Sequence, residues 1–375
     1  MPLSIKGAVT ASFALLSASA LGTDWNVIHQ QGREYVTFAN VAQFYQFPDY
    51  TRVSRTVSLR SNRRGIRAQA GTSELYINGV RFFTDYPLLS SATDALISAM
   101  DVSKIMEPVL RPSRIRGPKK VETVVLDPGH GGVDGGASTQ WGNEKGFALD
   151  VVLAARTELL REGFKVEMTR ARDVARSLEE RVDFANQFTN AVFISIHFNS
   201  SSGGAGLESY SLAPADVISN ASTEEHSAAP AAPSCAGNEQ DPQNIALTAA
   251  VHATILARVA PFDRGVRHAR FHVLRNVKLP AVLLEAGFLS DATEGPRIAT
   301  AQYRQQLGAA IAQGVQTYNA AVNYQAGGSS FAVAKTNLPP HDRSITEPLA
   351  PENAAALTPV SRTITGPSVS INGEQ

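Results

Sequence analysis

The fold class is decided by residues 121–129, VETVVLDPG, and by the helical pattern that follows them over residues 144–162. Residues 121–126 form a short apolar run that is typical of a strand, and residues 144–162 repeat apolar side chains at helical spacing. Further strand and helix patterns then alternate along the chain, with strands over 165–169, 191–196, 206–212, 271–274 and 281–285 and helices over 178–188, 242–259 and 303–318. This alternation predicts an α/β fold, an open and mostly parallel sheet with helices on both faces.

The segments around this unit predict different structures. Residues 24–110 contain short alternating strands and an Asn78-Gly79 hairpin, so we expect a small β-rich domain there. Proline and basic residues over 111–120 predict a linker to a catalytic domain at 121–322. That domain carries a Pro/Ala/Ser-rich insertion at 213–243, and the composition of residues 325–375 is typical of a disordered tail.

Composition is that of a globular protein, with 375 residues of which 43% are hydrophobic and 18% charged. The single cysteine, Cys235, excludes a disulfide framework and a cysteine-rich zinc ribbon. Lys6, the uncharged run 7–21 and Ala18-Ser19-Ala20 within it predict a signal peptide over residues 1–22, hence an exported protein of the periplasm or cell envelope. An unstructured N-terminus is the alternative, and no later run approaches the ~20 apolar residues of a membrane span.

The formal net charge of +0 hides an asymmetry. Residues 24–120 hold 14 Lys and Arg against 8 Asp and Glu, about +6, which could favour an anionic polymer as partner. A solvated basic face with a linker is an equally weighted alternative. We expect a monomer that does not bind nucleic acid.

Four polar residues occupy positions where α/β sheets carry their sites, beyond the carboxyl ends of strands. His130 follows the first strand, His197 ends the apolar run 191–196, and Glu285 ends the run 281–284. Glu144 opens a helix after a glycine-rich loop. Each residue alone has an ordinary structural explanation, but such explanations are weaker for four residues at the strand ends of one sheet.

Two imidazoles and one carboxylate form a ligand set of catalytic zinc, which leaves a fourth position for water. Zinc lowers the pKa of that water from about 15.7 to near 7. Amide cleavage also needs a second carboxylate to carry a proton to the amine leaving group. Composition and spacing alone therefore predict a metal-assisted hydrolase, with Glu285 placed for the proton transfer.

Residues 122–319 resemble the catalytic domain of zinc-dependent N-acetylmuramoyl-L-alanine amidases. The matching blocks occur in the family's order, at residues 125–132, 143–145, 169–170, 193–199, 263–266 and 280–290. The resemblance implies that His130, Glu144 and His197 bind one Zn²⁺ ion and that Glu285 is the catalytic glutamate. It also implies the reaction, in which zinc-bound water, with Glu285 as general base and acid, cleaves the amide between N-acetylmuramic acid and L-alanine in peptidoglycan.

The chain departs from the family pattern at two places. Ala286 stands where a hydroxyl residue is more usual, which removes no ligand. The insertion at 213–243 falls where some members carry an inhibitory helix, but its prolines disfavour a long helix. Gating of the zinc by Glu224, Glu225 or Glu239 is a hypothesis.

Two other functions stay open: a zinc peptidase of the cell wall, and a catalytically silent, wall-binding regulatory protein. Peptidoglycan is the expected partner, and an envelope activator protein is a candidate second partner. Residues 24–110 also weakly resemble the small N-terminal β-domain of copper amine oxidases, although no copper site is present in their sequence.

Overall fold

The computed structural model describes residues 25–220 and 233–324. The predicted signal peptide, the predicted tail and two insertion residues, Glu224 and Glu225, lie outside these residues. In the described part, no helix combines the length and apolar character that a membrane crossing requires.

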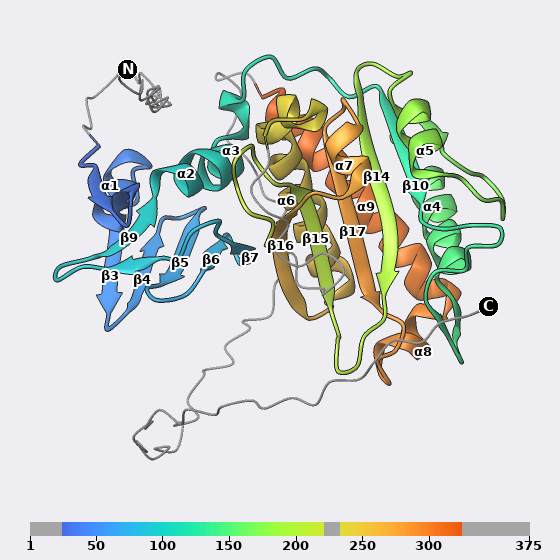
Figure 1. Ribbon diagram of the computed structural model, residues 1–375, viewed down its shortest axis with the longest axis horizontal. Helices are drawn as coiled ribbons and strands as arrows, with labels where there is room; N and C mark the ends of the chain where they lie inside the picture. Colours follow the sequence, from blue (N-terminus) through green and yellow to red (C-terminus); the bar gives the residue numbers. More distant parts are fainter. Residues whose placement is uncertain (1–24, 221–232, 325–375) are drawn as a thin grey trace, which may run out of the picture. The chain divides into compact units, whose positions relative to one another are not determined.

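An eleven-stranded sheet runs through the described chain (Figure 1). Its strands, in sheet order, are β13 (Lys165–Met168), β10 (Thr123–Pro128), β14 (Ala191–Asn199), β17 (Ala281–Phe288), β15 (Leu207–Leu212), β16 (Asp263–Ala269), β7 (Val80–Phe83), β6 (Glu74–Ile77), β5 (Gly65–Gln69), β4 (Thr56–Arg60) and β3 (Asp49–Val53). Two small sheets accompany it, one of β1 (Ile28–Gln30), β2 (Arg33–Thr37), β9 (Ala95–Ser98) and β8 (Leu89–Ser90), the other of β11 (Ser138–Thr139) and β12 (Gly142–Asn143).

The eleven-stranded sheet is mixed as a whole, so a mostly parallel sheet is not confirmed for it. Among the six strands of the predicted catalytic domain, four of the five neighbouring pairs are parallel and β15–β17 is antiparallel. The pairs β13–β10, β10–β14, β14–β17, β15–β16 and β16–β7 are parallel, and the other five neighbouring pairs are antiparallel. The physical reason is the length of the connections. Tight hairpins join β3 to β7 and can only produce antiparallel neighbours, whereas helical crossovers make β10, β13 and β14 parallel.

Helices cover both faces of the central strands, as predicted. Val124 and Leu126 of β10 pack into the core formed with α4 (Glu144–Arg161), α6 (Asp241–Val259) and α9 (Ala301–Val322). Val125, between them, packs with α5 (Leu178–Ala185) and α7 (His272–Asn276) on the opposite face. This alternation explains why the strands are continuously apolar, since neither face meets water.

One predicted strand is a helix. The sequence predicts a strand over residues 271–274, but residues 272–274 belong to α7, and the strand of this region is β16, which begins at Asp263. A run of four apolar residues fits a buried strand and a buried helical turn equally well, so its period could not decide between them.

The N-terminal β-rich domain shares both its sheet and its core with the rest of the chain. Val266 of β16 pairs with Phe82 of β7, and Ile245 of α6 packs into the N-terminal core. Ile115, in the segment predicted as a linker, is buried in the core around α9. The remaining helices are α1 (Phe38–Phe44), α2 (Ala99–Asp101), η1 (Val102–Met106), α3 (Glu107–Leu110), η2 (Pro112–Arg114), η4 (Ala236–Gln240) and α8 (Glu294–Ile298).

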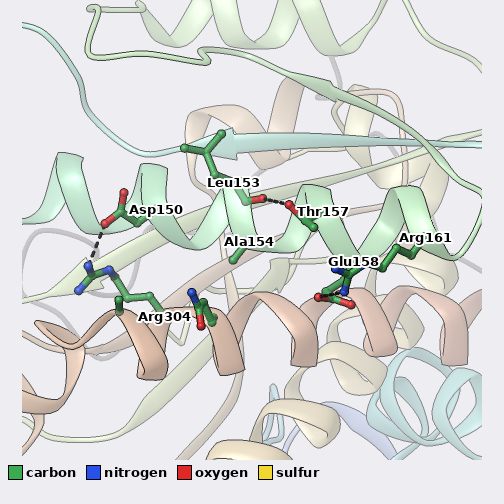
Figure 2. A pocket seen from close by; sticks show the side chains of 9 residues that line it. Asp150, Leu153, Ala154, Thr157, Glu158, Arg161 and Arg304 are labelled. Atoms are coloured by element: carbon green, nitrogen blue, oxygen red, sulfur yellow. Dashed lines mark hydrogen bonds and ion pairs between the residues drawn. The ribbon is translucent and has the colours of Figure 1, made fainter.

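A groove of about 560 Å³ lies between α4 and α9 (Figure 2). Its polar side chains are paired with one another: Arg304 with Asp150 at 3.0 Å, and Arg161 with Glu158 at 2.8 Å. Thr157 donates to the carbonyl of Leu153 on the same helix. The Arg304–Asp150 pair joins the two helices, whereas the other two contacts lie within α4.

Candidate metal centre

The predicted site residues lie at the carboxyl ends of neighbouring strands. His197 of β14 is opposite Glu285 of β17, and Glu285 is opposite Glu208 of β15. Since side chains alternate along a strand, His197 and Glu285 share the sheet face of Phe193 and Leu283, which is the face covered by α5 and α7. Beyond the ends of these short helices the face opens into a cleft of about 1190 Å³.

The structure brings His130, Glu144 and His197 together. Oε1 of Glu144 lies 3.0 Å from Nε2 of His130 and 2.9 Å from Nδ1 of His197. One ligand atom from each of the three residues lies within 4.8 Å of the others, so the cluster could hold a metal ion. Glu144 is the first residue of α4, and its Oε1 also accepts the backbone N–H of Phe198 at 3.0 Å.

The backbone around His130 must approach the other ligands closely. A Cβ atom on Gly129 would lie 2.4 Å from the ring of His197, and one on Gly136 would lie 2.5 Å from Oε2 of Glu144. His130 itself has a φ of 55°, which is uncommon for a residue other than glycine. At positions 129 and 136, only glycine leaves room for the cluster.

Buried polar side chains hold this loop in place. Asp127, at the end of β10, accepts hydrogen bonds from Ser195 and Thr169 and pairs with Arg181 at 2.6 Å. Arg181 also donates to the carbonyl oxygen of His130 at 2.8 Å. Arg170 donates to the carbonyl of Gly129 at 2.6 Å, so two buried guanidinium groups fix the segment that carries the first histidine.

Asp134 orients the His130 ring. Its Oδ2 lies 2.9 Å from Nδ1 of His130. With a metal ion bound, this carboxylate would keep the proton on Nδ1 and leave Nε2 as the ligand atom.

The two glutamates differ in their protonation. Burial opposes ionisation of Glu144, but hydrogen bonds from His130 and His197 outweigh it and hold the pKa of Glu144 well below its usual range. Burial, together with the charges of Glu144 and Glu208, raises the pKa of Glu285 well above its usual range. Oε2 of Glu285 is buried without a hydrogen-bond partner in the described part of the chain. The site thus combines an ionised carboxylate between two imidazoles with a second carboxyl group suited to exchange a proton.

Ala286 and the described insertion residue Glu239 lie away from the cluster. Ala286 is buried in the α4–α6–α9 core, because its side chain points to the other face of β17. Glu239 is exposed on η4 and does not line the cleft.

Sequence reasoning missed Asp134 and Arg181. Asp134 follows His130 by four residues, a spacing that a search for a carboxylate partner of the histidine could have found. Arg181 precedes the buried Val182 on α5 and is itself buried, and a charged residue beside the apolar face of a helix was the available signal.

The sequence also has relatives among known proteins. A family model, Amidase_3, described as N-acetylmuramoyl-L-alanine amidase, matches residues 124–317. The sporulation-specific N-acetylmuramoyl-L-alanine amidase of Bacillus subtilis is 33% identical over 195 residues, which are 52% of this chain and 66% of the relative. The N-acetylmuramoyl-L-alanine amidase LytC of the same organism is 30% identical over 55% of this chain and 37% of its own length.

Among solved structures, the catalytic domain of CwlV, an N-acetylmuramoyl-L-alanine amidase from Bacillus (Paenibacillus) polymyxa, is 30% identical with a TM-score of 0.44. The match covers 53% of this chain and 98% of the CwlV structure. The chain thus spans less than two thirds of the two curated relatives and nearly all of the solved domain. Because the family model matches more than half of its residues, the chain belongs to the N-acetylmuramoyl-L-alanine amidase family Amidase_3.

Proposed function

We propose that this protein is a zinc-dependent amidase that hydrolyses the bond between N-acetylmuramic acid and L-alanine in peptidoglycan. One observation carries the proposal: His130 and His197 both turn a ring nitrogen toward the same oxygen of Glu144. Membership of the family supports the reaction class, and the donor set supports the metal.

The residues present fit a zinc ion. Two imidazole nitrogens with one carboxylate oxygen are a known ligand set of catalytic zinc, and they leave one coordination position open. His130 fits this role because Asp134 engages its other nitrogen, as is usual for metal-bound histidines. A zinc ion held by His130, Glu144 and His197 would supply Lewis acidity at neutral pH, both to polarise the amide carbonyl and to activate water.

Glu285 is proposed to move the proton. Glu285 is opposite His197 on the neighbouring strand and lines the cleft, and its buried Oε2 has no hydrogen-bond partner among the described residues. Hydrolysis needs one proton taken from the attacking water and one delivered to the nitrogen of the departing L-alanine. Glu285 would perform both transfers, and its raised pKa favours the second.

This function implies a location outside the cytoplasmic membrane, where peptidoglycan lies. The predicted signal peptide at 1–22 is consistent with export, and zinc, a secreted monomer and an envelope activator belong to the same proposal.

Digestion of purified peptidoglycan tests the function. The zinc-loaded protein should release intact stem peptides that begin with L-alanine, leaving glycan strands with a free lactyl carboxylate, as identified by mass spectrometry. Cuts within the stem peptides would instead indicate a zinc peptidase. Binding to the wall without any released product would indicate a silent regulatory protein.

A further inference from the structure

The cleft contains a guanidinium group that the proposed reaction does not use. We propose that Arg264 forms a subsite for a carboxylate on the peptide half of the substrate, the half that departs as an amine. This inference rests on the proposed amidase function. It adds the requirement that the peptide half of the substrate carries a negative charge.

Arg264 is placed at the correct edge of the sheet. Its neighbour Gly265 on β16 pairs with Glu208, which pairs with Glu285, which pairs with His197. Neighbouring strands lie about 4.8 Å apart, so three spacings separate β16 from the histidine by about 14 Å. The arginine side chain shortens this span because its guanidinium reaches back to Phe288 at the end of β17. A few residues of extended peptide, each about 3.3 Å long, would span the remaining distance between the guanidinium and the proposed metal ligands.

Two contacts fix the orientation of the guanidinium. Its Cζ lies 4.7 Å from the centroid of the Phe288 ring, and its Nε lies 3.3 Å from Oε1 of the fully buried Glu208. Within residues 25–220 and 233–324, its terminal nitrogens donate no hydrogen bond. These nitrogens form the edge that binds a carboxylate through two parallel hydrogen bonds. Arg264 is therefore a preoriented donor that lines the cleft.

Glu208 has two arginine neighbours, and only one of the two lines the cleft. Arg264 and Arg267 both approach Oε1 of Glu208, at 3.3 and 3.2 Å, so one carboxylate faces two guanidinium groups. Arg267 is engaged elsewhere, since it stacks on Phe83 at 3.6 Å and donates to the carbonyl of Asn220. Arg267 does not line the cleft. Of these two arginines, Arg264 is thus the one that can present its charge to a substrate.

Only the peptide half of the substrate can match that charge. N-acetylmuramic acid is otherwise uncharged, and its one carboxyl group is consumed in the bond that is cut. The stem peptide, in contrast, carries carboxylates on its acidic residue and at its C-terminus. A guanidinium fork in this cleft therefore selects for a free peptide carboxylate.

The test uses two soluble muropeptides with the same glycan and peptide, one with free peptide carboxylates and one with these groups amidated. For the zinc-loaded wild type we expect kcat/KM to be about 10- to 100-fold higher on the free acid, mainly through KM, the range of charge-assisted hydrogen bonds. Arg264→Met, which keeps the apolar stem over Phe288, should lower kcat/KM on the acid and bring the ratio near one. Arg264→Lys should give an intermediate ratio, because it keeps the charge and loses the fork.

Arg267→Met is the matched control. It removes the other partner of Glu208 outside the cleft, so the wild-type preference for the acid should persist. Equal cleavage of both muropeptides by the wild type, or an unchanged ratio in Arg264→Met, would overturn the subsite while the amidase function stands. Cleavage of neither muropeptide would overturn the amidase function itself. If Arg264→Met does not fold, the wild-type ratio alone decides.

Discussion

Histidine meets carboxylate in two clusters of this molecule. In the cleft, His130 and His197 share one oxygen of Glu144. Where β16 adjoins the N-terminal β-rich domain, His268 contacts Asp85 at 2.6 Å, and the backbone N–H of Asp85 donates to Asp101. We refer to His268, Asp85 and Asp101 as the junction cluster.

The two clusters differ in sharing and in access. The junction cluster has one imidazole and two carboxyl groups. A proton shared between His268 and Asp85 is enough to form their hydrogen bond, so this pair needs no metal ion. Its His268 and Asp85 side chains are 3% and 0% exposed. In the cleft, one ionised carboxylate lies between two rings whose side chains are 25% and 22% exposed. Residue types alone do not distinguish a metal site from a structural ion pair. What distinguishes the metal site is that two imidazoles share one carboxylate oxygen beside an open cleft.

Removal of the metal should have the largest effect, and only on the cleft. Chelation should abolish peptide release from peptidoglycan, and added Zn²⁺ should restore it, because the metal would polarise the amide carbonyl and activate the water. His197→Ala should lose both metal and turnover, whereas His268→Ala should keep its metal. Metal content by elemental analysis, with turnover measured in parallel, checks this. Full turnover by a metal-free protein would contradict the proposed site.

Glu285→Gln should separate proton transfer from metal binding. The amide has the size of the carboxyl group but cannot accept and return a proton, so kcat should fall by about 10²- to 10⁴-fold. Metal content should stay at the wild-type level because Glu285 is not a proposed ligand. Stability should not fall, since the substitution removes a buried carboxyl group with an unpartnered oxygen. Unchanged turnover would refute the assigned role.

The sequence predicted most of the fold because most segments were long enough to show their period. The helix at 144–162 and the continuously apolar strand at 191–196 both appear within a residue or a few of their predicted bounds. Strand direction was harder to predict. That β15 runs antiparallel to β17, and that β16 joins β7, are tertiary pairings that no local pattern encodes.

The site could be predicted in part for the same reason. Strand ends converge at one edge of a sheet, so His130, His197 and Glu285 were expected to meet there, as they do. Arg181 was not expected, because its role is to bind backbone oxygens of a loop 51 residues away in sequence. Contacts of this kind between a side chain and a distant loop depend on the folded path of the loop, so no periodic pattern in the sequence indicates them.

Asp85→Asn should weaken the fold and leave catalysis intact. It removes the charged partner of a buried histidine, which costs about 3–5 kcal/mol in buried pairs of this kind. As a control, Arg161→Met breaks the exposed pair with Glu158 on α4 and should change the free energy of unfolding by less than about 1 kcal/mol. Urea unfolding measures both. Equal destabilisation by the two variants would show that the junction cluster contributes little to stability.

The last prediction concerns the response of the junction cluster to pH. Burial and the charge of Asp85 raise the pKa of Asp101 to about 8. A carboxyl group whose pKa is higher in the folded than in the unfolded state destabilises the fold as it ionises. Stability should therefore fall as pH rises from about 4 to about 8, by up to about 1.4 kcal/mol per pH unit for each proton. Burial lowers the pKa of His268, but Asp85 outweighs it and raises that pKa, so the stabilising charge of His268 is also lost as pH rises.

Asp101→Asn should remove the contribution of Asp101 to this slope. An amide imitates the protonated carboxyl group, since Oδ1 can still accept the N–H of Asp85 and Nδ2 can donate to Ser98. The variant and the wild type should therefore be about equally stable at pH 4, and the variant should be more stable at pH 9. Urea unfolding of zinc-saturated protein between these values measures the difference. Parallel curves for the two proteins would show that Asp101 does not titrate within the fold. The slope would then belong to His268 alone, and the junction cluster would hold a single exchangeable proton.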